Sequence, residues 1–165
     1  MRKILASAAT VAAAAAMLGG VGLAAASTHA GVSGTENFQL MTTSATSSNL
    51  SLIASGVFTA PAVDHEHQAT NTATFVFSNG TINLKHSNGT GTQNFNPKTC
   101  LLTINQHGTY NLTSGTGAYT GITGSGKYQL SILAISAKSG GKCVQNKPPV
   151  AFHQLINASG PVSLP

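Results

Sequence analysis

Apolar and polar side chains alternate along most of the chain from Gly31 onward, and no stretch there carries a convincing 3.6-residue apolar period. A period of two is the signal of β-strands that bury one face. The pattern predicts eight strands, at residues 36–43, 50–59, 69–78, 81–87, 99–105, 109–113, 126–137 and 150–158. Segments rich in Gly, Pro, Ser and Asn separate them, at residues 44–48, 61–67, 88–97, 106–108, 115–124 and 139–149.

The clearest local signal is a hairpin over residues 74–85. Asn79-Gly80 is the favoured two-residue turn, because both positions of such a turn need a positive φ. This register places four apolar side chains on one face, with Phe77 opposite Ile82 and Phe75 opposite Leu84.

Eight short strands predict an all-β protein, either a sandwich or a barrel, and we favour an eight-stranded antiparallel barrel. A barrel leaves no free strand edges, and its interior is filled by side chains or holds one small ligand. A barrel embedded in a membrane is disfavoured. The positions expected to face outward, such as Ser51, Asn83 and Thr103, are polar where lipid would require an apolar band.

The first thirty residues have the layout of a secretory signal peptide. Basic residues Arg2 and Lys3 precede a long uncharged run rich in Ala, Val, Leu and Gly, and small residues follow at Ala26 and Ala30. A membrane anchor is the alternative, since the run is long enough to span a bilayer. We favour a signal peptide at 1–30, cleaved after Ala26 or Ala30, and a single barrel domain at 31–165. The protein is then secreted, to the extracellular space or the cell envelope, without stable membrane insertion.

Composition adds two constraints to this picture. The 165 residues carry 8 basic and 3 acidic side chains, and removal of Arg2 and Lys3 lowers the net charge from +5 to +3. The six remaining lysines are dispersed and no arginine follows residue 30, which argues against nucleic-acid binding. Cys100 and Cys143 are the only cysteines, and an even count in an exported chain predicts one disulfide. A metal or redox pair is the less favoured alternative, because there is no C-x-x-C motif.

A glycine-punctuated segment at residues 115–126, Gly-Thr-Gly-Ala-Tyr-Thr-Gly-Ile-Thr-Gly-Ser-Gly, follows Gly-Thr-Tyr-Asn-Leu at residues 108–112. Glycine permits a positive φ and close backbone approach, as at a barrel corner, and Tyr119 is the one bulky side chain available to plug that end. A phosphate-binding loop is excluded, since no Lys-Ser/Thr ending and no helix follow.

This segment resembles the G-T-G-x-[YF]-x-G-x-x-G signature of the allene oxide cyclase-like and dirigent-like β-barrels, most of all their small exported bacterial members. The matching positions, carried over as a structural motif, are Gly115, Gly117, Tyr119, Gly121 and Gly124. The resemblance implies an eight-stranded antiparallel barrel with an apolar cavity, which in the plant relatives guides cyclisation or coupling of an apolar small molecule. The acidic catalytic positions of those relatives have no match here, so no catalytic residue is carried over.

Acidic residues are scarce, and the three carboxylates are Glu36, Asp64 and Glu66. A glycosidase needs two carboxylates that face each other across a cleft. These three residues do not favour such a pair, because Glu36 lies near the start of the predicted domain and Asp64 and Glu66 share one short segment. Ser125 lies between glycines but outside a G-x-S-x-G pattern, which disfavours a serine hydrolase.

The segment Asp64-His65-Glu66-His67 is the one dense cluster of titratable residues. On a strand, His65 and His67 would share one face and could hold zinc or copper with a third ligand. The candidates for that ligand are His86, His107 and His153. We favour a solvated polar loop, because nothing in the spacing fixes the third ligand.

Tyrosines recur every nine residues, which matches consecutive strands crossing one barrel and favours core packing over chemistry. Aromatic residues are nevertheless the expected lining of any ligand cavity, and these are Phe75, Phe77, Tyr110, Tyr119 and Tyr128. We expect a non-enzymatic exported protein that binds an apolar small molecule and needs no cofactor. The alternatives are an allene oxide cyclase-like isomerase or cyclase, and a cell-envelope interaction protein with a filled interior. The oligomeric state stays open.

Overall fold

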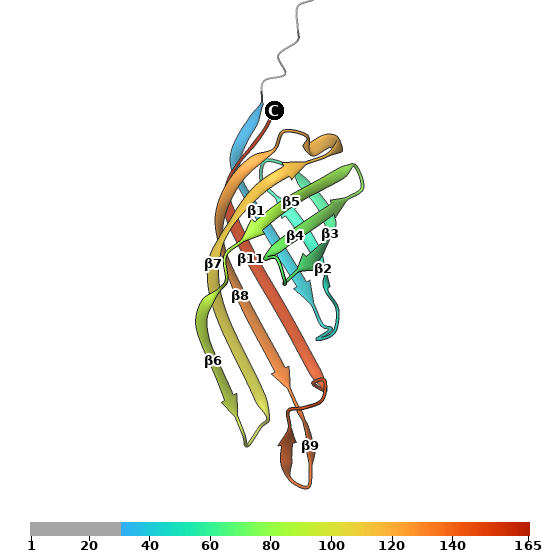
Figure 1. Cartoon of the computed structure of the whole chain (residues 1–165), viewed down its shortest axis with the longest axis vertical. Helices are drawn as coiled ribbons and strands as arrows, with labels where there is room; N and C mark the ends of the chain where they lie inside the picture. The colour runs from blue at the N-terminus through green and yellow to red at the C-terminus, as the bar shows by residue number, and fades with distance from the viewer. Residues whose placement is uncertain (1–30) are drawn as a thin grey trace, which may run out of the picture.

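The computed structural model describes residues 31–165, which form eleven β-strands and one 3-10 turn (Figure 1). The strands are β1 (Val32–Thr42), β2 (Asn49–Ser55), β3 (Thr59–His67), β4 (Thr72–Phe77), β5 (Gly80–His86), β6 (Thr90–Asn96), β7 (Leu101–Gly115), β8 (Thr123–Ile135), β9 (Ala137–Ser139), β10 (Lys142–Val144) and β11 (Ala151–Leu164), and the turn is η1 (Gly117–Tyr119). None of these residues belongs to a helix long and apolar enough to cross a membrane. The predicted signal peptide at 1–30 lies outside the described residues.

Eight of the strands close into an antiparallel barrel, which confirms the predicted fold class. Around the barrel the order is β1, β2, β3, β4, β5, β7, β8 and β11, and β11 pairs with β1 to complete the circle. The inner face carries the apolar side chains that the alternation predicts, among them Phe38, Leu40, Leu50, Leu52, Phe75, Ile82 and Leu84. Burial of these side chains supplies the main driving force for the closed barrel.

The strand boundaries differ from the prediction in several places, and the following differences bear on the barrel and the extension of its sheet. Residues 61–67, expected to form a turn, belong to β3, and residues 88–97 contain β6. Residues 106–108 do not break the chain, so the two strands expected at 99–105 and 109–113 are the single strand β7. Gly108 is needed for close packing and not for a turn, because a Cβ there would lie 2.6 Å from Cε1 of Tyr128.

The β4–β5 hairpin keeps the predicted faces but not the predicted register. Phe75 pairs with Ile82 and Phe77 pairs with Gly80, so the turn is formed by residues 78–79. A Cβ on Gly80 would lie only 2.1 Å from the carbonyl oxygen of Thr116. Gly80 therefore allows the backbone before η1 to pack closely against the hairpin. Because the register differs from the prediction by two residues, every side chain remains on its expected face.

One end of the barrel is closed by aromatic side chains around η1. Tyr119 is buried, and its ring centroid lies 4.6 Å from that of Phe77 and 5.0 Å from that of Phe58. Gly117 and Gly121, on either side of Tyr119, adopt φ values of 59° and 79°, which favour glycine. The glycine-rich segment is thus the cap of the barrel, between the end of β7 and the start of β8.

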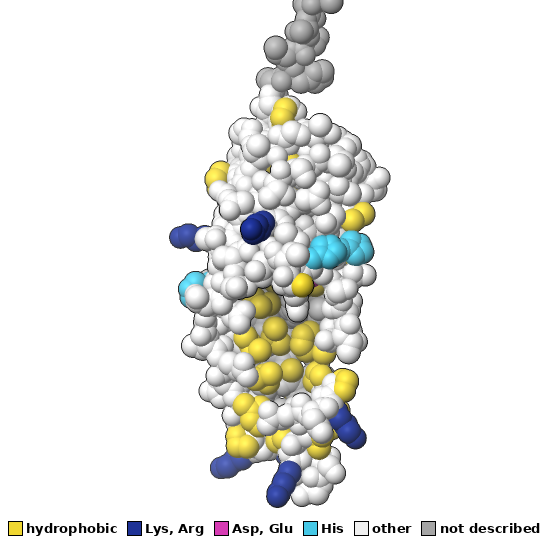
Figure 2. All heavy atoms as spheres, in the orientation of Figure 1, with side chains coloured by type: hydrophobic (Ala, Val, Ile, Leu, Met, Phe, Trp, Pro, Cys, Tyr) yellow, Lys and Arg dark blue, Asp and Glu magenta, His cyan; other side chains and the backbone are white. Residues whose placement is uncertain are grey.

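Beyond the other end of the barrel, β6 and the adjoining parts of β7, β8 and β11 continue as an open sheet, which we call the extension (Figure 1). The face that continues the inner face of the barrel is a shallow trough of about 240 Å³. Its apolar lining includes Phe95, Leu102, Ile104, Ile132, Ala134 and Phe152. Figure 2 shows apolar side chains gathered over this part of the molecule.

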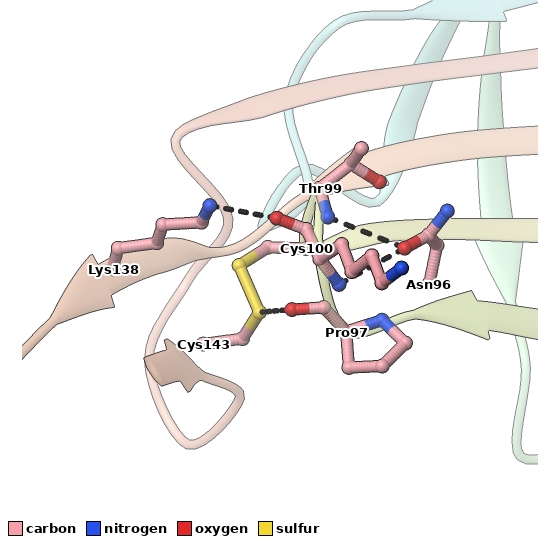
Figure 3. The surroundings of a disulfide bond; sticks show 7 residues. Asn96, Pro97, Thr99, Cys100, Lys138 and Cys143 are labelled. Atoms are coloured by element: carbon pink, nitrogen blue, oxygen red, sulfur yellow. Dashed lines mark hydrogen bonds between the residues drawn. A yellow bond between two sulfur atoms is a disulfide. The ribbon is translucent and has the colours of Figure 1, made fainter. Parts of the chain in front are cut away.

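A disulfide joins Cys100 and Cys143, as predicted (Figure 3). Cys100 lies between β6 and β7, and Cys143 lies on β10, so the bond fastens the β9–β10 hairpin to the tip of the extension. Nearby, Lys138 Nζ donates a hydrogen bond of 2.7 Å to the carbonyl oxygen of Lys98. The hairpin is thus held by one covalent bond and one charge-assisted hydrogen bond.

The disulfide predicts a measurable loss of stability on its removal. The two cysteines are 43 residues apart, and the chain-entropy model gives about 4 kcal/mol for a closed loop of that length. We expect Cys100→Ser/Cys143→Ser to lower the free energy of unfolding by about that amount in denaturant titrations of the oxidised proteins. Added reductant should destabilise the wild type and leave the double variant unchanged. Equal stability of the two oxidised proteins would contradict the prediction.

Candidate functional site

A cavity of about 340 Å³ lies inside the barrel, between the aromatic cap and the end that adjoins the extension. Its walls are mainly apolar, with Phe38, Leu40, Leu50, Phe75, Leu84 and Ile156 among the lining residues. Its mouth is lined by the polar residues Gln68, Asn71, Ser87 and Asn88, from the segments that follow β3 and β5. The interior therefore offers an apolar chamber with a polar rim.

All three carboxylates of the chain point into the barrel. Glu36 is 0% exposed and Asp64 is 1% exposed, while the side chain of Glu66 is 19% exposed. Asp64 and Glu66 line the cavity because they lie at alternate positions of β3. The favoured interpretation of residues 64–67 as a solvated loop is therefore wrong, and the small side chains of Ala60 and Ala62 explain why the strand was missed.

Asp64 is held among apolar neighbours. Its cross-strand partners are Leu50 on β2 and Phe75 on β4, and no hydrogen-bond partner reaches its Oδ1 atom. Burial raises the pKa of Asp64 from 3.8 to about 7, with a further increase from the charge of Glu66 and a smaller, opposing effect from His86. This carboxyl group can hold or release a proton near neutral pH.

Glu66 and His86 form a pair at the side of the cavity. His86 Nε2 lies 2.9 Å from Glu66 Oε1, and His86 Nδ1 lies 3.2 Å from the carbonyl oxygen of Ser87. A carbonyl oxygen only accepts, so Nδ1 carries a proton, and the pair is either imidazolium with carboxylate or neutral imidazole with carboxylic acid. Tyr128 donates a hydrogen bond of 2.9 Å to the same Ser87 oxygen.

Tyr110 supplies a second polar atom without a partner. The residue is 3% exposed, and its hydroxyl makes no hydrogen bond. Burial, together with the charge of Glu36, raises the pKa of Tyr110 to about 12. The hydroxyl stays neutral at physiological pH and can both donate to and accept from a ligand in the cavity.

The residues predicted to line the interior divide into two groups. Phe75, Tyr110 and Tyr128 line the cavity, whereas Phe77 and Tyr119 belong to the aromatic cap. The polar residues of the cavity, Asp64, Glu66 and His86, were not predicted as a group. The period of two in residues 64–67 places Asp64 and Glu66 on one face of a strand, but it gives no indication of His86 on β5.

The histidines considered for metal binding do not meet. His65 and His67 alternate with Asp64 and Glu66 on β3 and so face outward, while His86 points inward to Glu66. Across residues 31–165 no group of three or more His, Cys, Asp or Glu side chains is placed to hold a metal ion. The described residues give His65 and His67 no third ligand.

No protein-family model, curated protein or solved structure matches the chain. The resemblance to the allene oxide cyclase-like and dirigent-like barrels therefore stays a prediction.

The state of Asp64 predicts how stability depends on pH. Its pKa is higher in the folded state, so the folded protein binds a proton that the unfolded chain releases between pH 4 and 7. The contribution of protonated Asp64 to the free energy of unfolding is therefore fully present below pH 4, and it is lost as the pH rises to about 7. The loss is on the order of 4 kcal/mol at most, since each pKa unit corresponds to about 1.4 kcal/mol.

We expect the wild type to lose stability between pH 4 and 8 and Asp64→Asn to lose much less. Asparagine has a similar shape but no charge, so it should also make the protein more stable than the wild type at pH 8. Denaturant titrations at several pH values would measure both effects. Parallel pH profiles for the two proteins would show that Asp64 is not the group responsible.

Proposed function

We propose that the protein binds a small, largely apolar molecule inside the barrel. The observation that carries this proposal is the cavity of about 340 Å³, with apolar walls and a few inward polar groups. Small-molecule sites in proteins have this size and composition. Two buried polar atoms without partners belong to residues that line the cavity, Asp64 Oδ1 and Tyr110 Oη, and they are suited to orient one polar group of the ligand.

The alternative of an interaction protein with a filled interior receives less support. Such a barrel would pack its inner face with side chains, as happens at the cap around Tyr119 and Phe77. Small residues such as Ala73 and Ala158 border the cavity instead. Small side chains on β4 and β11 therefore leave this space open.

A cyclase or isomerase acting on an apolar substrate is the second candidate function. The feature that favours it is the Asp64 carboxyl group, whose pKa of about 7 suits proton transfer at neutral pH. The cavity would hold a flexible substrate in one conformation, and Asp64 would donate or accept the proton. The resemblance to allene oxide cyclase-like barrels points in the same direction.

We also propose that the protein works outside the cytoplasm. The Cys100–Cys143 disulfide is typical of oxidising compartments. The signal-peptide layout of the first thirty residues supports the same location.

The binding proposal is tested with N-phenyl-1-naphthylamine, a neutral apolar fluorophore whose emission rises in apolar surroundings. We expect saturable binding to the wild type and a loss of roughly tenfold or more in affinity for Ala73→Phe, because a loss of about 1.4 kcal/mol of contact energy is a factor of ten. Ala73 lines the cavity, and the added ring would occupy it.

Val76→Phe is the matched control, since Val76 lies on the same strand and its side chain is exposed. This variant should bind the probe as the wild type does. Circular dichroism and thermal melts establish that both variants are folded. Absence of saturable binding to the wild type, or an equal loss in both folded variants, would contradict binding in the cavity.

A further inference from the structure

The charges of residues 31–165 are divided between the inside and the outside of the barrel. The three carboxylates face inward, while all six lysines are exposed and none lines the cavity. Figure 2 accordingly shows lysines, and no acidic side chains, on the visible surface. Among the described residues that line the cavity, His86 is the only basic side chain, and it is already paired with Glu66. When Asp64 is ionised, the cavity therefore carries a negative charge for which the described residues provide no second cation.

Ionisation of Asp64 is unfavourable in an empty barrel or in one that holds a purely apolar molecule. Burying a carboxylate without a counter-charge is costly. Asp64 is almost completely buried, its Oδ1 has no partner, and its neighbours across the strands are Leu50 and Phe75. A cationic ligand would remove this cost, whereas a neutral ligand would remove only part of it and an anionic ligand would increase it.

We propose that the cavity selects organic amines, that is, apolar and preferably aromatic molecules that carry one protonated nitrogen, with the ammonium group at Asp64. The inference rests on the proposed binding function and names the class of ligand. The ammonium would donate to the free Oδ1 of Asp64, and the neutral Tyr110 hydroxyl is the second acceptor available to it.

Aromatic rings around the carboxylates favour the same class of ligand. Phe38, Phe75, Tyr110 and Tyr128 all line the cavity, and Phe38 packs against Phe75 with 5.2 Å between ring centroids. Aromatic faces attract cations, most strongly where water is excluded, and they also pack against an aromatic ligand. The cavity thus combines a counter-ion with surfaces that suit the rest of an aryl amine.

The proposal has a consequence for protons. The titratable groups that line the cavity with Asp64 are Glu66 on β3, His86 on β5, Tyr110 on β7 and Tyr128 on β8, while β1, β2, β4 and β11 contribute none to this lining. A bound ammonium stabilises the ionised form of Asp64, so binding near pH 6 releases a proton from that carboxyl group. Affinity for an amine should therefore rise between pH 5.5 and 7.5, and affinity for a neutral analogue should not.

The test uses three probes with the same ring and different charge: 1-naphthylmethylamine, 1-naphthylmethanol and 1-naphthoate. Isothermal titration calorimetry of the wild type at pH 7.5 should give about tenfold to a hundredfold tighter binding for the amine than for the alcohol, as expected for one charge-assisted hydrogen bond. The carboxylate should bind most weakly. Titrations at pH 6 in two buffers of different ionisation enthalpy measure the proton release.

Asp64→Asn separates the role of the charge from the role of the cavity. This variant should bind the alcohol almost as the wild type does, while the ratio of amine to alcohol affinity falls to near one and its pH dependence disappears. Glu36→Gln is the matched control, because Glu36 is equally buried but does not line the cavity. Its amine-to-alcohol ratio should remain that of the wild type.

The outcomes are distinguishable. Equal affinity of the wild type for amine and alcohol would overturn the charge selection and leave the proposed binding function standing. A ratio that survives in a folded Asp64→Asn variant would overturn the role of Asp64. Failure of all three probes and of N-phenyl-1-naphthylamine to bind would overturn the proposed function and the selectivity with it.

Discussion

The pairing of β5 with β7 is the contact on which the rest of the structure depends. β7 pairs with β6 along residues 101–107 and with β5 along its second half, so it changes partner midway. At that point Ser87 N donates to the carbonyl oxygen of Thr109, and Thr109 N donates to Ser87 Oγ, each at 2.9 Å. The Ser87 carbonyl oxygen in turn accepts from Tyr128 and lies beside His86. Ser87, which lies where β7 changes partner, thus also positions the side chains of His86 and Tyr128 in the cavity.

Closure of the barrel creates both the apolar chamber and its electrostatic cost. A closed ring separates the inner face from water, so acidic side chains on that face lose their hydration. Hydrogen bonds within the protein replace part of this hydration for two of them. Glu36 Oε2 accepts a hydrogen bond of 3.1 Å from Phe58 N, and Glu66 pairs with His86. Asp64 has no such partner at Oδ1. Glu36 Oε1 also lacks a partner, but Glu36 does not line the cavity, so Asp64 is the carboxylate whose unpartnered oxygen belongs to the cavity lining.

The sequence predicts the faces of the strands better than their ends. Period-two alternation identifies Phe38, Leu52 and Phe75 as inward residues, because large apolar side chains at alternate positions have few other arrangements. β3 gives no such signal, since its inward residues are small or acidic. Gly108 resembles a turn residue in isolation and is explained only by the Tyr128 ring packed against it. The sequence also could not group Asp64 and Glu66 on β3 with His86 on β5. Their contact depends on the closed barrel and not on a local pattern.

The two functions considered for the cavity make opposite demands on Asp64. Acid-catalysed cyclisation requires a protonated carboxyl group, which the apolar surroundings favour by raising its pKa to about 7. Binding an ammonium requires the ionised form and lowers that pKa again. Once an amine is bound, Asp64 serves as a counter-ion or a base and no longer as an acid. Amine selection therefore favours a binding protein, or proton abstraction from the ligand, over acid-initiated ring closure.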